Sequence, residues 1–198
     1  GCAAVAMAQL MKYWNWPDTA CGHNIYYAWQ YNWLEVDFSK AVYDWSNMPD
    51  AVDEHTPAHR KNAVASLVYH CGVSVDMIYG ASNSASLFAH DPVYWPGKNC
   101  VETAFVKYFR YKSSIRAIRM NLPDSTWKSI IKKEISARRP VLYMGYDKNL
   151  GEAHAYVIDG YNSSGQFHVN WGVYGIHNDN YYDINQMGFD GYNFTGAN

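Results

Sequence analysis

The spacing of apolar side chains divides the sequence into two parts with different patterns. Residues 3–15 carry small and apolar side chains over most of a helical surface and stop before Pro17, which predicts a buried helix. Residues 57–71, 99–111 and 124–138 also predict helices. The rest of the aromatic-rich stretch 17–60 predicts turns and short helices, and residues 74–86, rich in Ser, Gly and Asn, predict a loop.

After Pro140 the pattern changes to short apolar and aromatic runs separated by Gly, Asn and Ser. The runs are PVLYMGYD, HAYVIDGY, GQFHVNWG and NYYDIN, which are typical of antiparallel strands. We therefore predict an α+β fold in a single domain over residues 1–198. Residues 1–139 would form a mainly helical lobe and residues 140–198 a mainly antiparallel β lobe, and the cleft between two such lobes is a natural place for a site.

Composition removes several classes of partner and cofactor. A net charge of −2 gives no electrostatic reason to expect nucleic acid or a membrane surface, and no apolar run is long enough to span a membrane. The four cysteines, Cys2, Cys21, Cys71 and Cys100, lack both a C-x-x-C pair and a repeated spacing. We therefore predict neither a disulfide scaffold nor a metal site, and the thiol chemistry considered below needs no cofactor.

Cys2 stands at the start of the first predicted helix. The unpaired backbone N–H groups and the positive end of the helix dipole favour a thiolate there, which is the nucleophilic form of cysteine. The alternative is a small buried apolar residue, since free cysteines are often buried. A nucleophile would need a base from elsewhere in the chain.

His154 is the best candidate for that base, because it opens a predicted strand after the loop KNLGEA. Asn170, in the next strand, could orient the imidazole through its amide oxygen, and Trp171 could shield that hydrogen bond from water. The side chains of His154 and Asn170 can share a face of the sheet only if the hairpin has odd parity, through an odd-length loop or a bulge. Gly165 suits such a loop. His168 is a rival base, but it has the same strand parity as Asn170 and no separate orienting residue.

Two other functions fit parts of the sequence. An aromatic-rich module that binds carbohydrate or protein could use the tryptophans Trp14, Trp16, Trp29, Trp33 and Trp45. An N-terminal-nucleophile amidase would need Gly1 to be trimmed so that Cys2 becomes the terminal residue. That fold is a four-layer sandwich, and the helical first half argues against it.

Four blocks in the same order, GCAAVAMAQLMKYWNWP, GVSVDMIYG, AHAYVIDGY and FHVNWG, resemble the streptopain family of papain-like bacterial cysteine proteases. The resemblance runs from residue 1 to about residue 191 and implies a papain-like two-lobe fold. It implies that Cys2 is the nucleophile, His154 the general base and acid, Asn170 the orienting residue and Trp171 the shield. It further implies a secreted cysteine endopeptidase, made as a zymogen, whose partners are protein or peptide substrates and an amino-terminal prodomain.

Three departures from the family pattern affect the expected site. An upstream part of the mature domain is expected before residue 1, with the side chain that completes the oxyanion hole beside the Cys2 amide. The family's NWGW is NWGV here, ending in Val173, and the glycine-rich loop near the carboxy end is shortened to NQMGFDGYN. The substrate groove is expected to be lined by SVDMIYGASNS and KNLGEA, with the residues Ser82, Asn83, Gly151, Glu152 and Ala153.

Overall fold

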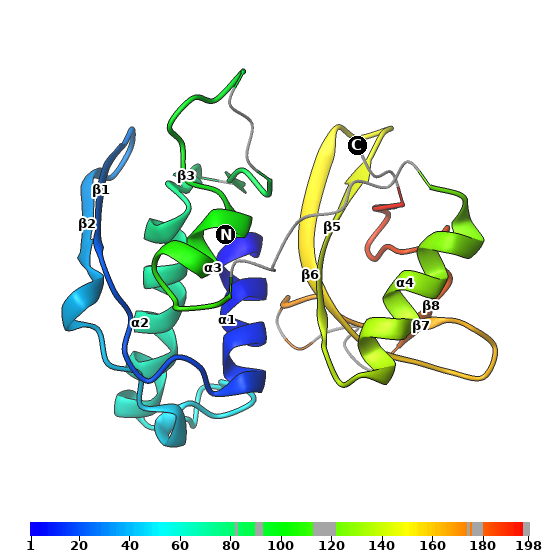
Figure 1. The fold of residues 1–198 in the computed structure, drawn as a ribbon, viewed down its shortest axis with the longest axis horizontal. Coiled ribbons are helices and arrows are strands. Elements are labelled where there is room, and N and C mark those ends of the chain that lie inside the picture. The colour runs from blue at the N-terminus through cyan, green and yellow to red at the C-terminus, as the bar shows by residue number, and fades with distance from the viewer. Residues whose placement is uncertain (82, 90–92, 113–121, 174, 176–179, 196–198) are drawn as a thin grey trace. The chain divides into compact units, whose positions relative to one another are not determined.

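The computed structural model describes residues 1–81, 83–89, 93–112, 122–173, 175 and 180–195. Two compact units make up the chain: the first contains residue 1 and residues 3–117, and the second contains Cys2 together with residues 118–198. Both units are drawn in Figure 1. The first unit combines helices with two short hairpins, and the second combines one helix with an antiparallel sheet.

The first unit is built on α1 (Cys2–Trp14) and α2 (Ala58–Ser74), which match the predicted helices 3–15 and 57–71. The buried positions of α1 are small residues and methionines: Ala3, Ala4, Ala6, Met7, Ala8 and Met11. Small side chains let a neighbouring helix approach closely. A Cβ atom added to Gly72 of α2 would accordingly lie 3.9 Å from the Ala4 Cβ, and the Cys71 Sγ atom lies 3.7 Å from Met11 Sδ. A shorter helix, α3 (Val101–Lys107), lies within the predicted range 99–111.

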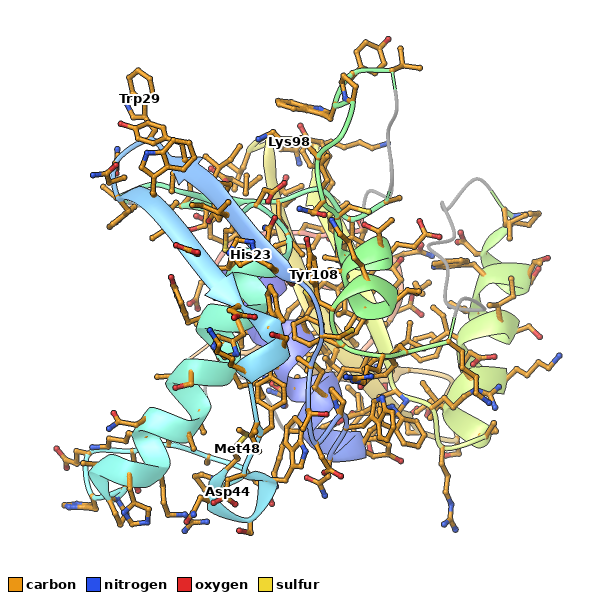
Figure 2. All side chains as sticks on the ribbon, turned by 60° about the vertical axis from the view of Figure 1, so that its left-hand side comes forward. His23, Trp29, Asp44, Met48, Lys98 and Tyr108 are labelled. Atoms are coloured by element: carbon orange, nitrogen blue, oxygen red, sulfur yellow. The ribbon has the colours of Figure 1, made fainter. Side chains whose placement is uncertain are left out.

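The prediction of turns and short helices for residues 17–60 is wrong for a hairpin of β1 (His23–Ala28) and β2 (Asn32–Asp37). Only short 3-10 turns, η1 (Phe38–Lys40) and η2 (Trp45–Asn47), follow it. One face of the hairpin buries Tyr26 and Val36, whereas Tyr27 and Trp33 on the other face are more than half exposed. Because aromatic residues occupy both faces, the alternation that identifies a half-buried strand is missing from the sequence. Trp29 stands at the tip (Figure 2).

Two further short strands lie inside the predicted loop 74–86. They are β3 (Ile78–Tyr79) and β4 (Ser84–Ala85), which pair antiparallel. Two residues per strand are too few to produce a recognisable periodicity, so the loop prediction holds for the connecting residues only.

The second unit contains α4 (Asp124–Ser136) and a sheet of order β5–β6–β7–β8. The strands are β5 (Val141–Asp147), β6 (Glu152–Tyr161), β7 (Phe167–Asn170) and β8 (Tyr181–Tyr182), so all four predicted strands are confirmed. The division after residue 117, and not after residue 139, places α4 with the sheet. The physical reason is that α4 buries Trp127 and Ile131 on the sheet core, and Trp127 Nε1 donates a hydrogen bond of 2.9 Å to the Tyr143 hydroxyl.

Among the described residues, no helix combines the length and the apolar character that crossing a membrane requires.

A half-buried histidine makes the stability of the first unit sensitive to mild acid. The Tyr43 hydroxyl lies 3.0 Å from His70 Nδ1, and burial lowers the pKa of the His70 imidazole below its ordinary value of 6.5. The unfolded chain therefore takes up a proton near pH 6.5 that the folded chain still excludes, so the free energy of unfolding should decrease as the pH falls below 6.5. Denaturant unfolding at pH 7.5 and 5.5 should show this decrease, and His70→Gln should reduce it. The control is His55→Gln, at an exposed histidine, and an unchanged pH dependence in His70→Gln would refute the assignment.

Candidate active site

Cys2 is the first residue of α1, and its side chain is half-buried. The first hydrogen bond of the helix runs from Val5 N to Gly1 O and is 3.2 Å long. The backbone N–H groups of the first turn therefore point out of the N-terminal end of the helix, where Cys2 lies. The following residues Ala3 and Ala4 carry no charge that would oppose a thiolate. The start of α1 therefore has the electrostatic character expected for a nucleophilic cysteine.

The β3–β4 hairpin lies next to this helix start. A Cβ atom added to Gly1 would be 2.4 Å from Met77 Sδ and 2.8 Å from the Ser84 Cβ, so only glycine fits between the helix and the hairpin. Asn83, one residue before β4, accepts a 2.8 Å hydrogen bond from Gly80 N through its backbone oxygen. The predicted groove residue Asn83 is thus held on the hairpin that contacts Gly1, whereas Ser82 lies outside the described residues.

His154 lies in β6, directly opposite Gly145 of β5. Its Nε2 atom is 2.8 Å from the backbone carbonyl oxygen of Trp171. Four aromatic rings have their centroids within 5.4–6.1 Å of the imidazole centroid, and they belong to Tyr156, Trp171, Phe189 and Phe194. The imidazole is therefore fixed by one hydrogen bond and by aromatic contacts.

The hydrogen bond to Trp171 determines which imidazole nitrogen can act as a base. A carbonyl oxygen only accepts hydrogen bonds, so Nε2 of His154 must carry the proton. In the neutral ring the lone pair then lies on Nδ1. His154 is consequently arranged to take up and release a proton at Nδ1.

The structure corrects the prediction that Asn170 orients His154. The loop closed by the 2.9 Å bond from Asn162 N to Gln166 O, with Gly165 at a φ of 82°, has the odd parity that would place both side chains on one face. However, the register shifts between Ile158 and Gly160, which leaves Asp159 as a bulge. This second change of parity cancels the first, so Asn170 pairs with Val157, on the face opposite to His154.

Asn170 instead shapes the turn that presents the Trp171 carbonyl. Its Oδ1 atom accepts a 3.0 Å hydrogen bond from Gly172 N, which closes a turn around Trp171. Gly172 has a φ of 69°, in the left-handed region that glycine adopts without strain. The influence of Asn170 on His154 thus passes through the backbone.

Trp171 returns to the same face as His154 because side chains alternate along the strand. It is 1% exposed and packs in the sheet core with Tyr156, Ile158 and Val169. Its indole ring is tilted by 37° against the imidazole, at a centroid distance of 6.1 Å. This arrangement allows Trp171 to limit the access of water to the His154 hydrogen bond.

The rival base His168 is engaged elsewhere. Its Nδ1 atom is hydrogen-bonded to the carboxylate of Asp159, the bulge residue. The imidazole of His168 also contacts the ring of Tyr181 on β8, at a centroid distance of 5.2 Å. His168 therefore links the bulge at Asp159 to the edge strand β8.

The remaining predicted groove residues lie in the turn between β5 and β6 and at the start of β6. Gly151 has a φ of 70° and donates its N–H to Asp147 O at 2.9 Å. Glu152 and Ala153 begin β6 and lead directly into His154, with Ala153 exposed and Glu152 half-buried. Sequence reasoning did not identify Asp147, the buried residue from which this turn starts.

The described residues contain no group of three or more His, Cys, Asp and Glu side chains that could bind a metal ion. The two residues predicted to react, Cys2 and His154, supply a thiol and an imidazole, and the start of α1 adds backbone N–H groups.

Comparison with known proteins identifies the family. The sequence model of the peptidase C10 family matches residues 1–182. The chain belongs to the peptidase C10 family. This result confirms the resemblance to streptopain and its relatives that the four sequence blocks indicate.

Curated relatives of this C10 chain include thiol proteases. It is 35% identical over 188 residues to the thiol protease/hemagglutinin PrtT of Porphyromonas gingivalis, and the matched region covers 92% of this chain and 20% of that protein. It is also 34% identical over 185 residues to streptopain of Streptococcus pyogenes, and the matched region covers 89% of this chain and 43% of that protein. The chain thus spans less than half the length of either relative.

Solved structures of C10 peptidases are also similar. Active wild-type interpain A of Prevotella intermedia matches with a TM-score of 0.86 and 31% identity, over 100% of this chain and 80% of that one. A fragment of prointerpain A from the same organism matches with a TM-score of 0.79 and 31% identity, over 93% of this chain and 56% of that one. The mixture of helices and antiparallel sheet is therefore that of a known cysteine protease.

The two histidines of the β6–β7 hairpin should show opposite tautomers. In neutral His154 the proton should be on Nε2, which bonds to the Trp171 carbonyl, whereas in neutral His168 it should be on Nδ1, which bonds to Asp159. Nitrogen-15 NMR of the histidine rings at alkaline pH distinguishes the two forms, and His168 serves as the internal control. A proton on Nδ1 of His154 would contradict the assigned base atom.

Proposed function

We propose that this protein is a cysteine endopeptidase that hydrolyses peptide bonds of proteins through an acyl-enzyme. Cys2 is the nucleophile and His154 the general base and acid. The hydrogen bond between His154 Nε2 and the Trp171 carbonyl is the observation that carries this proposal, because it reserves Nδ1 for proton transfer. The proposal requires that Cys2 Sγ and His154 Nδ1 come within reach of each other.

The reaction follows from the chemistry of these two groups. His154 Nδ1 takes the proton of the Cys2 thiol, and the thiolate attacks the carbonyl carbon of the scissile bond. The Cys2 backbone N–H donates to the resulting oxyanion. His154 then delivers its proton to the leaving amine, the C–N bond breaks and a thioester forms. A water molecule, deprotonated by Nδ1, attacks the thioester and releases the acid, and the proton returns to the thiolate.

Trp171 and Asn170 support the base without taking part in bond making. The Trp171 carbonyl fixes the ring and its tautomer, and the indole shields that hydrogen bond. Asn170 fixes the turn through Gly172 N. A neutral orienting group leaves the imidazole free to change charge during each half-reaction.

Substrates and partners follow from the family. We propose that the substrate lies along Asn83 on the β3–β4 hairpin and along Gly151, Glu152 and Ala153 before the base. Ser82 belongs to the same proposed groove. We also propose secretion and synthesis as a zymogen with an amino-terminal prodomain, which the match to a prointerpain A fragment supports by analogy. The reaction as written needs no cofactor.

A protein-binding surface is a second candidate function, and it would accompany the peptidase. The outer face of the β1–β2 hairpin exposes Tyr27 and Trp33, whose rings meet edge to face at 5.5 Å, and Trp29 at the tip is 85% exposed. Exposed Trp and Tyr are enriched in interfaces. Trp45, by contrast, is buried and takes no part in such a surface.

Selective alkylation tests the peptidase proposal directly. At pH 6 iodoacetamide should modify Cys2 about 10²-fold faster than the half-exposed Cys21, because only a thiolate reacts and ordinary thiols ionise near pH 8.5. His154→Ala should abolish the difference. Peptide mapping by mass spectrometry measures both cysteines in one sample, so Cys21 is the internal control. Equal rates at Cys2 and Cys21 in the unaltered protein would contradict the proposal.

The indirect role of Asn170 gives a separate prediction for catalysis. Asn170→Ala removes the acceptor for Gly172 N and should lower kcat/KM about tenfold. Asn170→Asp keeps an acceptor oxygen and should retain most of the activity. Gly172→Ala should resemble Asn170→Ala, because a φ of 69° strains any residue with a Cβ. Steady-state hydrolysis of a fluorogenic peptide provides the measurement, and wild-type activity in Asn170→Ala would refute the role.

A further inference from the structure

Asp147 is a buried carboxylate that joins two segments of the second unit. It is 2% exposed at the end of β5. One oxygen, Oδ1, accepts hydrogen bonds from Asn149 N at 2.9 Å and from Leu150 N at 3.1 Å. The other, Oδ2, accepts a hydrogen bond of 2.7 Å from Asn193 N. The same side chain therefore holds the β5–β6 turn and the segment near the carboxy end.

The carboxy-terminal segment 187–194 is closed by its own hydrogen bonds. Phe194 N donates to Met187 O at 2.6 Å, and Tyr192 N donates to Phe189 O at 2.9 Å. Met187 is fully buried, and its sulfur accepts a 3.3 Å hydrogen bond from the Tyr156 hydroxyl. The segment is thus anchored at one end in the sheet core and at the other end by Asp147.

Gly145 allows this segment to lie directly on β5 opposite His154. A Cβ atom on Gly145 would be 2.1 Å from Phe194 O and 2.7 Å from the Phe194 Cβ, so a larger residue would displace the segment. The Phe194 and Phe189 ring centroids are 5.4 and 5.6 Å from that of His154. Two of the four rings around the imidazole therefore depend on where this segment lies.

We propose that Asp147 is a positioning residue for the peptidase reaction, acting on His154 from two sides. Its Oδ2 holds the 187–194 segment, and with it Phe189 and Phe194, against the imidazole. Its Oδ1 holds the turn that runs through Gly151 into His154. This inference rests on the proposed role of His154 as the base.

The charge of Asp147 suits this task. The hydrogen bond from Asn193 N–H, followed by those from Leu150 and Asn149, holds the pKa of the Asp147 carboxyl below its ordinary value despite burial. A carboxylate accepts hydrogen bonds on both oxygens, whereas an amide offers one acceptor and one donor. An asparagine at position 147 can therefore accept hydrogen bonds either from the β5–β6 turn or from the 187–194 segment. Its NH₂ group then faces the backbone N–H of the one that is left, and two donors form no hydrogen bond.

The test compares Asp147→Asn with Asp183→Asn in the processed enzyme. Asp183 is a matched control, because its carboxylate also accepts a backbone hydrogen bond, from Asn185 N at 2.9 Å, and a second one from Lys128 Nζ at 3.1 Å. We expect Asp147→Asn to lower kcat by at least about tenfold, since small displacements of a reacting group are costly. Asp183→Asn should leave kcat within about twofold of the unaltered enzyme.

A second readout is independent of activity. The carbon-bound protons of the His154 ring experience the ring currents of Phe189 and Phe194. In Asp147→Asn their chemical shifts should therefore move toward random-coil values, whereas in Asp183→Asn they should not change. The spectra are recorded in a Cys2→Ala background to prevent hydrolysis. If the unaltered enzyme hydrolyses no peptide, the proposed function fails, and the shift of the His154 signals still decides the role of Asp147.

Unchanged kcat together with unchanged His154 signals in Asp147→Asn would overturn the inference, as would equal losses of kcat in both variants. If Asp147→Asn does not fold, Phe194→Leu replaces it, because leucine keeps an apolar side chain and removes the ring. Phe194→Leu should lower kcat and shift the His154 signals in the same direction. The inference is overturned if it changes neither.

Discussion

The hydrogen bond from His154 Nε2 to the Trp171 carbonyl oxygen is the interaction on which the proposed chemistry depends. It exists because Asp159 forms a bulge in β6 and shifts the register of β7 by one residue. Without the bulge, Asn170 would share a face with His154, and Trp171 would alternate to the opposite face. One additional residue in a strand therefore selects a backbone carbonyl as the partner of the imidazole.

A backbone carbonyl has physical advantages as the partner of a catalytic base. It cannot donate a proton or change charge, so it fixes one tautomer throughout the reaction. Its position is set by the turn that Asn170 closes with Gly172 N. The segment that carries Phe194 is held by the hydrogen bond from Asn193 N to the Asp147 carboxylate. The imidazole is thus oriented by one backbone carbonyl and by aromatic rings, and the turn and the segment that supply them are held by hydrogen bonds to backbone N–H groups.

Much of the fold follows from the sequence, and the failures have identifiable causes. The helices α1, α2 and α4 and the strands of the second unit have clear periodicities and ends, and Gly165 adopts the left-handed conformation expected of its turn. The β1–β2 hairpin was not predicted because Tyr27 and Trp33 make its exposed face as aromatic as its buried face. The orienting role of Asn170 was wrong because a bulge at Asp159 leaves only a weak trace in sequence, an aspartate inside a strand. Cys2 and His154 were predicted from their places at the start of a helix and of a strand; Cys2 is the first residue of α1, whereas β6 begins at Glu152, two residues before His154.

The central claim is that Cys2 Sγ and His154 Nδ1 act as one pair. Cross-linking with 1,3-dibromoacetone tests it most directly, because this reagent alkylates a thiol and then a second nucleophile only within the span of three carbon atoms. Peptide mapping of the treated protein should recover the peptide containing Cys2 covalently joined to the peptide containing His154 through Nδ1. Alkylation of Cys2 without a cross-link, or a cross-link from Cys2 to a different histidine, would contradict the account.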